Sequence, residues 1–376
     1  MKKKKVLYIL HGLAPGGIES FAINVVDNID RERVEISFAL ATEGKQFYED
    51  RVINAGCKVY KTSDLNGLKN IVRHFTKLVE LLKKEGPFDV VHSNIDFFNG
   101  VNLLAAFIAG VPVRISHAHS THSVNATSVH ATLSTKFYRL LMKSLIRLFA
   151  THFLGCSKQA NDYMHKWGRV DRRDSKVIFN GINVDKYRME EHDKKLCRES
   201  LGLPRDKICF LTVGRMCEAK NSLFIADVVK ELLEIRKDIH FIWVGTGRLE
   251  QQIKERIEKY GINEAFSFLG NRTDIPQIIA AADYFLFPSL WEGLPVALIE
   301  AQAGGLHCFI SDAITEEADI GLCTAISLKK DAKAWAEEIC EHMANKFGKR
   351  PVDCRRLKRF DIKETVRTLE NIYCSG

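Results

Sequence analysis

The chain has 376 residues, of which 46% are hydrophobic and 27% are charged. This length exceeds what one hydrophobic core usually supports, so the sequence predicts two domains of ordinary size in a soluble globular protein. No apolar run approaches the roughly 20 residues that span a bilayer, which argues against an integral membrane protein.

The formal net charge of +8 is unevenly distributed along the chain. Residues 1–190 carry 28 Lys and Arg against 18 Asp and Glu, whereas residues 191–376 carry 27 against 29. No acidic residue lies between Asp96 and Asp162. We therefore expect the first half to meet an anionic partner, either phosphates or an acidic membrane surface. Nucleic acid is not expected, because the second half offers no basic track and no nucleic-acid-binding motif is found.

The first residues, MKKKKVLYILHG, place only five apolar residues after a basic head, too few for the apolar segment of a signal peptide. The 10 cysteines are scattered, with no Cys-x-x-Cys pair and no zinc-finger spacing. Both features predict a cytoplasmic protein with reduced thiols.

Short apolar runs alternate with helical patterns in both halves of the chain. In the first half the predicted strands are residues 5–10, 34–40, 88–94 and 111–119, and the predicted helices are 18–29, 68–86 and 98–110. In the second half the predicted strands are 208–215, 239–247, 265–270 and 283–289, and the predicted helices are 222–235, 249–261, 275–282 and 297–305. Such alternation predicts α/β domains whose parallel sheets are covered on both faces.

The polar segment 189–206 marks the expected junction between the two halves. We expect a first Rossmann-like domain over 1–188, a second over 189–350, and a terminal helix within 351–376 that packs back on the first domain. Ligands of doubly wound domains bind at the carboxyl ends of the strands, here in a central cleft that the two domains face.

The most informative stretch is PSLWEGLPVALIEAQAGG, residues 288–305. A strand ends before it, Pro295 suits the first turn of a helix, and the two glutamates therefore fall in a loop (Glu292) and in the second helical turn (Glu300). If both glutamates lay on one helix, eight residues would separate them by about 12 Å, too far for the acid pair of a hydrolase. With Glu292 in the loop the sequence does not fix their distance, but it excludes two adjacent helical acids. The helix start near Leu294 to Val296 offers unpaired amides to a phosphate.

Two further loops follow predicted strands of the second half. FLTVGRMCEAKN supplies Arg215 and Lys220, which suit a diphosphate, although two solvated cations are the alternative. WVGTGRLE supplies Gly245 and Gly247, where backbone can approach a ligand closely, but the full dinucleotide motif is missing.

In the first half, Gly16 and Gly17 separate a strand from a helix. They favour either close approach to a phosphate or only a tight turn. Alternating histidines, His117, His119 and His122, follow another strand. Without an acidic or cysteine partner nearby they indicate a hydrogen-bonding histidine in the cleft rather than a metal site.

A basic amphipathic helix is predicted over 133–149, with Lys136, Arg139, Lys143 and Arg147 at three- and four-residue spacing. It favours either a core helix with one solvated basic face or a helix that docks on anionic lipid headgroups.

Taken in chain order, these stretches resemble the family-4 retaining glycosyltransferases of the GT-B fold over nearly the whole chain. The matching motifs are GGIE (16–19), HAHS (117–120), VIFNGINVDKY (177–187), VGR with Lys220, VGTG (244–247), FLGNRTDIPQIIAAAD (268–283) and the stretch with Glu292 and Glu300. The segment 93–120 is most similar to enzymes of capsule and exopolysaccharide assembly.

The resemblance implies transfer of a sugar from a nucleotide sugar, a UDP-sugar by expectation, to a polysaccharide precursor that is lipid-linked. Glu300 would bind the ribose, Glu292 the donor sugar, and Arg215 with Lys220 the diphosphate. His119 would contact the sugar near the reacting carbon and Arg272 would lie by the base. The donor-binding backbone would be that of Gly16, Gly17, Gly245, Gly293, Leu294, Pro295 and Val296. The family needs no bound metal, and a lipid-linked acceptor would place the protein at the inner face of the membrane.

Three positions depart from the family pattern: Asn221 replaces a common glycine, Asn183 a common aspartate and His307 a common proline. Two alternatives stay open at this point, a sugar-nucleotide 2-epimerase of similar fold and a non-catalytic subunit that binds a glycan or nucleotide.

Overall fold

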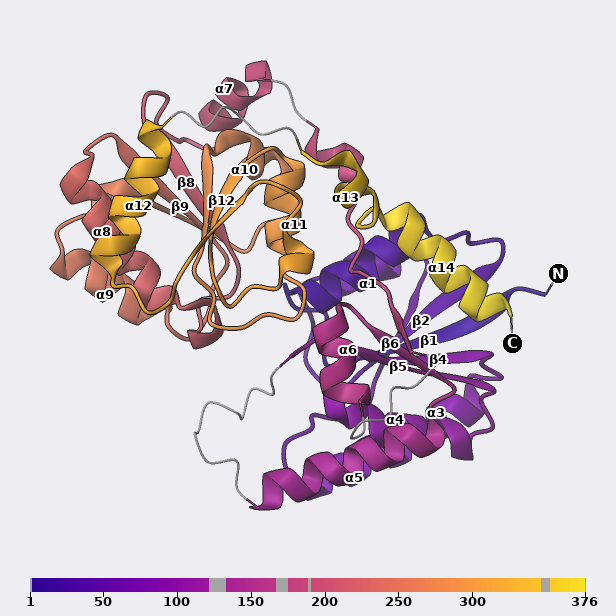
Figure 1. Ribbon diagram of the computed structural model, residues 1–376. Helices are drawn as coiled ribbons and strands as arrows, with labels where there is room; N and C mark the ends of the chain where they lie inside the picture. Colours follow the sequence, from indigo (N-terminus) through magenta and orange to yellow (C-terminus); the bar gives the residue numbers. More distant parts are fainter. Residues whose placement is uncertain (1, 122–132, 167–174, 189–190, 346–351, 376) are drawn as a thin grey trace. The chain divides into compact units, whose positions relative to one another are not determined.

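The computed structural model describes residues 2–121, 133–166, 175–188, 191–345 and 352–375. The chain divides into two compact units. Unit 1 comprises Met1–Gly181 together with Ile362–Gly376, and unit 2 comprises Ile182–Asp361. The boundaries expected from sequence, 188/189 and 350/351, fall on or beside residues that lie outside the described ranges. Figure 1 shows the two units in colours that follow the sequence.

Unit 1 is built on one parallel sheet of seven strands in the order β3-β2-β1-β4-β5-β6-β7. The strands are β1 (Lys4–Leu10), β2 (Val34–Leu40), β3 (Lys58–Lys61), β4 (Val90–Ser93), β5 (Val113–Ala118), β6 (His152–Gly155) and β7 (Ser175–Val177). The order reverses between β1 and β4, so their carboxyl ends flank the topological switch point where doubly wound sheets bind ligands.

Helices cover both faces of this sheet, as the sequence pattern predicts. They are α1 (Gly17–Asn28), α2 (Glu49–Asn54), α3 (Leu68–Lys84), α4 (Asn99–Ile108), α5 (Leu133–Phe149), α6 (Lys158–His165) and α14 (Ile362–Cys374). Side chains of β1 alternate between the two cores. Tyr8 packs in the core formed with α1 and α14, whereas Leu7 and Ile9 pack with α3 and α4.

The C-terminal helix α14 belongs to unit 1, and Figure 1 shows it beside α1. Tyr8 and Tyr373 share a buried hydroxyl–hydroxyl hydrogen bond of 2.6 Å, and the Asp30 amide donates to Glu370 at 2.9 Å. The chain thus returns to its first strand at its end.

Unit 2 repeats the same topology with a six-stranded parallel sheet, β10-β9-β8-β11-β12-β13. The strands are β8 (Ile208–Val213), β9 (Ile239–Val244), β10 (Phe266–Gly270), β11 (Tyr284–Phe287), β12 (His307–Ser311) and β13 (Cys323–Ile326). The helices are α7 (Glu191–Ser200), α8 (Ser222–Ile235), α9 (Glu250–Lys259), α10 (Ile275–Ala281), α11 (Val296–Ala303), α12 (Ala332–Ala344) and α13 (Cys354–Lys358). Here the switch point lies between β8 and β11. The predicted fold class, two doubly wound α/β sheets, is confirmed.

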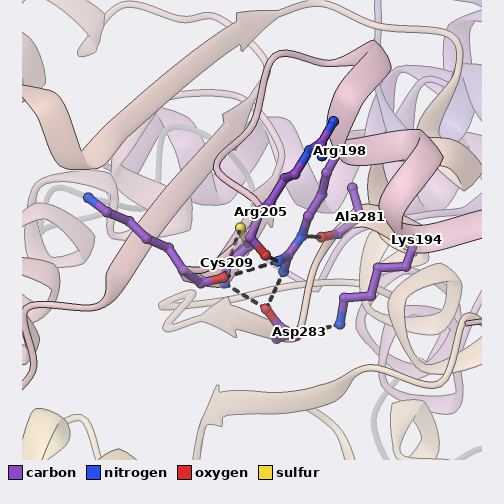
Figure 2. A network of polar contacts seen from close by, with 7 residues as sticks. Lys194, Arg198, Arg205, Cys209, Ala281 and Asp283 are labelled. Atoms are coloured by element: carbon purple, nitrogen blue, oxygen red, sulfur yellow. Dashed lines mark hydrogen bonds and ion pairs between the residues drawn. The ribbon is translucent and has the colours of Figure 1, made fainter.

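A buried ion-pair network fixes α7 to this sheet (Figure 2). The Arg198 guanidinium donates to Asp283 Oδ2 at 2.6 Å and to the carbonyls of Ala281, Arg205 and Lys207 at 2.9 to 3.1 Å. Asp283 also accepts from the Cys209 amide at 2.7 Å. Asp283 precedes β11 and Cys209 lies near the start of β8, so this network stabilises the amino edge of the sheet and leaves the carboxyl edge for ligands.

Candidate nucleotide-sugar site

The carboxyl ends of β8 and β11 bring together a lysine and a glutamate that lie 72 residues apart. Lys220 Nζ donates to Glu292 Oε1 at 2.6 Å, and the same ammonium lies 4.6 Å from the centre of the Phe287 ring. Both side chains are largely shielded from solvent. Arg215 lies two residues after the end of β8 and is exposed, and its guanidinium has no ion pair among the described residues. The switch point of unit 2 therefore holds two cations and one carboxylate.

The loop after β11 contains a buried hydroxyl without a partner. Ser289 is fully buried, and its Oγ makes no hydrogen bond within the described chain. Its backbone is held in place, because Ser311 Oγ donates to the Ser289 carbonyl at 2.5 Å and the Leu290 amide donates to the Ala219 carbonyl at 2.8 Å. Buried polar atoms are normally paired, so this hydroxyl, three residues before Glu292, has hydrogen-bonding capacity left for a ligand group.

Helix α11 starts at the end of this loop, and Glu292 and Glu300 lie in the loop and in the second helical turn, as predicted. Helical hydrogen bonding begins where the Leu298 amide donates to the Pro295 carbonyl at 3.0 Å. The Val296 amide lies in the first helical turn, at the positive end of the helix dipole, and Gly293 and Leu294 precede the N-cap residue Pro295. The side chains of Leu294 and Val296 are buried. Only their backbone can therefore meet a phosphate.

Glu300 has a partner that sequence reasoning missed. The hydroxyl of Tyr187, in the short helix η3 (Val184–Tyr187), donates to Glu300 Oε1 at 2.6 Å. Burial raises the pKa of Glu300 to about 7, and the hydrogen bond from Tyr187 opposes this rise. The carboxyl is thus poised between its acid and its carboxylate form near neutral pH. Tyr187 closes the motif VIFNGINVDKY, and this was the signal in the sequence that could have pointed to it.

Gly245 and Arg272 are each engaged by the protein itself. Gly245 has a φ of +119°, and a Cβ there would lie 2.2 Å from the Gly214 carbonyl oxygen, so close backbone packing requires this glycine. Arg272 binds the Asp274 carboxylate through two nitrogens, at 2.8 and 2.5 Å. That pairing holds the Arg272 guanidinium at the start of α10. Contacts of Gly245 and Arg272 with the nucleotide sugar remain predictions.

The departure at Asn221 has a structural explanation. Its φ of +52° and ψ of +41° lie in the left-handed region, which glycine adopts freely and asparagine tolerates better than most residues. The loop of Lys220 therefore keeps the conformation that a glycine would give it. His307 replaces the common proline and binds Thr324 Oγ1 at 2.9 Å, across the β12–β13 pair. For Asn183, which precedes η3, the structure offers no comparable account.

In unit 1, Gly16 and Gly17 start helix α1 after β1. The Ser20 amide donates to the Gly16 carbonyl at 2.9 Å, and a Cβ at Gly16 would lie 2.4 Å from Glu19 Oε2. The Glu19 carboxylate therefore folds back over the start of its own helix. A phosphate at this helix start would have to displace it.

His119 follows β5 and is buried. Asn94 orients it, because the amide nitrogen of Asn94 donates to the His92 carbonyl at 3.0 Å, which leaves its oxygen to accept from His119 Nε2 at 2.9 Å. Nδ1 then carries a lone pair and has no partner among the described residues. Burial lowers the pKa of His119 to about 3, so the ring is neutral, and its Nδ1 can accept a hydrogen bond from a hydroxyl.

A buried polar chain lies behind His119. Tyr373 binds His92 Nδ1 at 2.7 Å, His92 Nε2 lies 3.0 Å from His117 Nδ1, and the rings of His117 and His119 pack with centres 4.1 Å apart. Burial holds the pKa of His92 and of His117 well below the usual range. His117 is thus a core residue next to His119, whereas His122 lies outside the described residues. No group of three or more potential metal-binding residues occurs in the part of the chain that the structure describes.

The basic helix α5 has three distinct faces. Met142 and Ile146 are buried, and Arg139 and Lys143 lie over the Phe97 ring at 6.0 and 5.9 Å. A third stripe of large apolar side chains is exposed and includes Phe137 (66%), Leu140 (53%), Leu141 (44%) and Leu148 (72%). Lys136 and Arg147 are also exposed. In the described ranges no helix is long and apolar enough to cross a bilayer.

Comparison with known proteins gives two family matches in chain order. Residues 15–186 match "Glycosyltransferase Family 4" and residues 207–345 match "Glycosyl transferases group 1". The Bacillus subtilis (strain 168) protein named "Putative glycosyltransferase EpsF" is 29% identical over 99% of this chain and 96% of its own length. The Escherichia coli UDP-Gal:α-D-GlcNAc-diphosphoundecaprenol α-1,3-galactosyltransferase is 29% identical over 79% of this chain and 76% of its own.

Among solved structures, Anabaena HepE in complex with UDP and glucose superposes with a TM-score of 0.78 over 99% of this chain and 100% of its own, at 20% identity. Two Rossmann-like units with this strand order form the GT-B fold, and the enzyme class, glycosyltransferase, comes from the sequence matches. Both family matches and the full-length relatives agree with that class. The chain belongs to the group 1, family 4 glycosyltransferases.

Proposed function

We propose that this enzyme transfers a sugar, with retention of the anomeric configuration, from a UDP-sugar to a lipid-linked polysaccharide precursor. The observation that carries the proposal is the arrangement at the β8–β11 switch point. It combines the Lys220–Glu292 pair, the unpaired Ser289 hydroxyl, the start of α11 and the buried Glu300. Anabaena HepE, which has the same fold, is described with UDP and glucose, and the Escherichia coli relative is named for a UDP-sugar donor and a diphosphoundecaprenol acceptor.

The chemistry of unit 2 supports a nucleotide diphosphate in particular. The amides of Gly293 to Val296 and the cations of Arg215 and Lys220 would bind the diphosphate. Glu300, an acceptor when ionised, suits the two ribose hydroxyls, and Glu292 suits hydroxyls of the sugar. Because Lys220 already pairs with Glu292, one ammonium would link the sugar-binding carboxylate to the leaving phosphate.

In the proposed reaction the acceptor hydroxyl attacks the anomeric carbon on the face from which the diphosphate departs. The bond from that carbon to the diphosphate oxygen breaks, the new glycosidic bond forms, and the acceptor proton passes to the departing phosphate. Arg215, Lys220 and the α11 dipole would stabilise the charge that grows on the diphosphate. No bound metal is required in this proposal.

The acceptor side of the proposal rests on unit 1. Helix α5 places exposed apolar side chains next to Lys136, Arg139, Lys143 and Arg147, a combination suited to the interface of an anionic membrane. Changing these four cations to Gln, or Phe137 and Leu141 to Ser, should reduce sedimentation with vesicles that contain phosphatidylglycerol. Unchanged sedimentation of both variants would exclude α5 as the membrane contact.

The donor proposal is tested by thermal shift with UDP, GDP, ADP and their sugars. A ligand that binds only the folded state raises the melting temperature. We expect stabilisation by UDP and by at least one UDP-sugar, and a smaller shift for a Glu300→Ala variant, which loses the hydrogen bond to ribose. Equal shifts with all nucleotides would contradict a uridine-specific donor site.

A further inference from the structure

Asp96 stands out in unit 1 because of its backbone. It follows β4 at the sheet's switch point and begins the short helix η1 (Asp96–Phe98) with a φ of +41°. Among the described residues only Asp96 and Asn221 are non-glycine residues with positive φ. Aspartate tolerates this conformation better than most L-residues but adopts it less freely than glycine, and such positions often occur at functional sites.

The Asp96 carboxyl is also unpaired. Its Oδ1 is buried and has no hydrogen-bond partner in the described part of the chain, and burial raises its pKa to about 6. The turn does not need it, because Asn99 Oδ1 accepts from the Ile95 amide at 2.7 Å and from Ser93 Oγ at 2.7 Å. A buried acceptor without a donor destabilises the fold unless a ligand supplies one.

The neighbours of Asp96 indicate what that ligand is. Two residues before it, Asn94 holds His119 at the same sheet edge. The residue after it, Phe97, carries Arg139 and Lys143 of α5 over its ring. Burial and the charge of Arg139 lower the pKa of Lys143, so an anion beside the two cations would be stabilised. No ion pair joins Asp96 to either cation among the described residues.

A hydroxyl donor next to an anionic group is what a sugar linked to a lipid diphosphate presents. We infer that Asp96 accepts a hydrogen bond from a hydroxyl of the acceptor sugar, whose diphosphate is bound by Arg139 and Lys143. This inference rests on the proposed function, since it names the acceptor-binding residues of that reaction. Its three parts lie within unit 1: the strained turn, the unpaired oxygen and the cation pair on Phe97.

The test compares three full-length variants, Asp96→Gly, Asp96→Asn and the exposed control Asp30→Asn. Two acceptors are used with one UDP-sugar: a short-chain prenyl diphosphate N-acetylhexosamine and an alkyl N-acetylhexosaminide without diphosphate. Acceptor binding is measured by calorimetry, and transfer by the KM for each acceptor. UDP binding is measured separately.

Asp96→Gly should keep or raise the melting temperature, because it relieves the backbone and removes an unpaired buried carboxyl, and should raise the KM for both acceptors at least tenfold. Asp96→Asn keeps an acceptor oxygen and should have a smaller effect. Changing Arg139 and Lys143 to Gln should raise the KM for the diphosphate acceptor alone. UDP affinity should stay unchanged in every variant, and Asp30→Asn should behave as the wild type.

A melting temperature that falls in Asp96→Gly with an unchanged acceptor KM would show that Asp96 is structural and overturn the inference. If the wild-type protein binds UDP but neither acceptor, the inference about Asp96 is overturned, but the proposed donor site is not. Failure to bind UDP would instead count against the proposed function.

Discussion

Glu300 offers the sharpest quantitative prediction, because its buried carboxyl should ionise within the physiological range. With a pKa of about 7, the carboxylate is present in about one molecule in eleven at pH 6 and in about ten of eleven at pH 8. If ribose hydroxyls donate to the carboxylate, apparent affinity should follow this fraction. The gain from pH 6 to pH 8 is then about tenfold.

The assay is isothermal calorimetry with UDP on wild-type and Glu300→Gln protein from pH 5.5 to 8.5. Because UDP itself titrates, the informative quantity is the ratio of the two dissociation constants at each pH. The dissociation constant of Glu300→Gln divided by that of the wild type should rise about tenfold between pH 6 and pH 8 and level off above pH 8. Tyr187→Phe should move the midpoint to higher pH, because the lost hydrogen bond favours the carboxylate.

Stability gives an independent check on the same group. In the folded protein the Glu300 carboxyl keeps its proton up to about pH 7, whereas in the unfolded chain it loses the proton near the usual pKa of 4.5. The folded state therefore binds more protons between these pH values, and the free energy of unfolding falls as the pH rises from about 4.5 to about 7. Glu300→Gln should lack this fall. A flat ratio of dissociation constants across the range would refute the ribose role, whatever the stability curve shows.

Three further predictions concern unit 2. Lys220→Met should lower kcat by about 10²- to 10³-fold in steady-state assays, because it removes the partner of Glu292 and a donor to the leaving phosphate. The control Lys230→Met should keep wild-type kcat, and equal activity of the two variants would show that Lys220 is not part of the site. Arg198→Ala should destabilise the protein by about 1–3 kcal/mol in urea unfolding, since the carbonyls of Ala281 and Lys207 lose their side-chain donor while Lys194 still pairs with Asp283. Arg205→Ala keeps the carbonyl that Arg198 uses and should stay within about 0.5 kcal/mol; similar losses would contradict the network's role. Asn221→Gly should be neutral or stabilising and Asn221→Val should cost about 1–2 kcal/mol, an order that would be reversed if the left-handed loop did not persist in solution.

Much of the fold follows from local pattern. The strands predicted over 34–40 and 283–289 correspond to β2 (Val34–Leu40) and β11 (Tyr284–Phe287), because their apolar runs have to be buried on both faces of a parallel sheet. The short edge strands β3 and β7, at residues 58–61 and 175–177, carry no comparable pattern, since an edge strand of three or four residues is held by its neighbour more than by its own side chains.

For the candidate site, the sequence predicts where the main residues lie along the chain but not which residues they contact. The loop position of Glu292 and the helical position of Glu300 follow from a strand ending before Ser289 and a helix beginning at Pro295. The partners of these residues do not, because Tyr187 lies 113 residues from Glu300 and Asn94 lies 25 residues from His119. The sequence gives no signal for Asp96 either, because its positive φ and its unpaired carboxyl oxygen are visible only in the structure.

The central claim is tested most directly by incubating the purified full-length protein with a UDP-sugar panel and a polyprenyl diphosphate monosaccharide in detergent micelles containing EDTA. Release of UDP and growth of the lipid-linked glycan are followed together by mass spectrometry. The account predicts that one UDP-sugar gives UDP and one added sugar in equal amounts, that the reaction persists in EDTA, and that NMR of the product shows the anomeric configuration of the donor. A nucleotide sugar that is epimerised without release of UDP, or no UDP release with any donor, would contradict it.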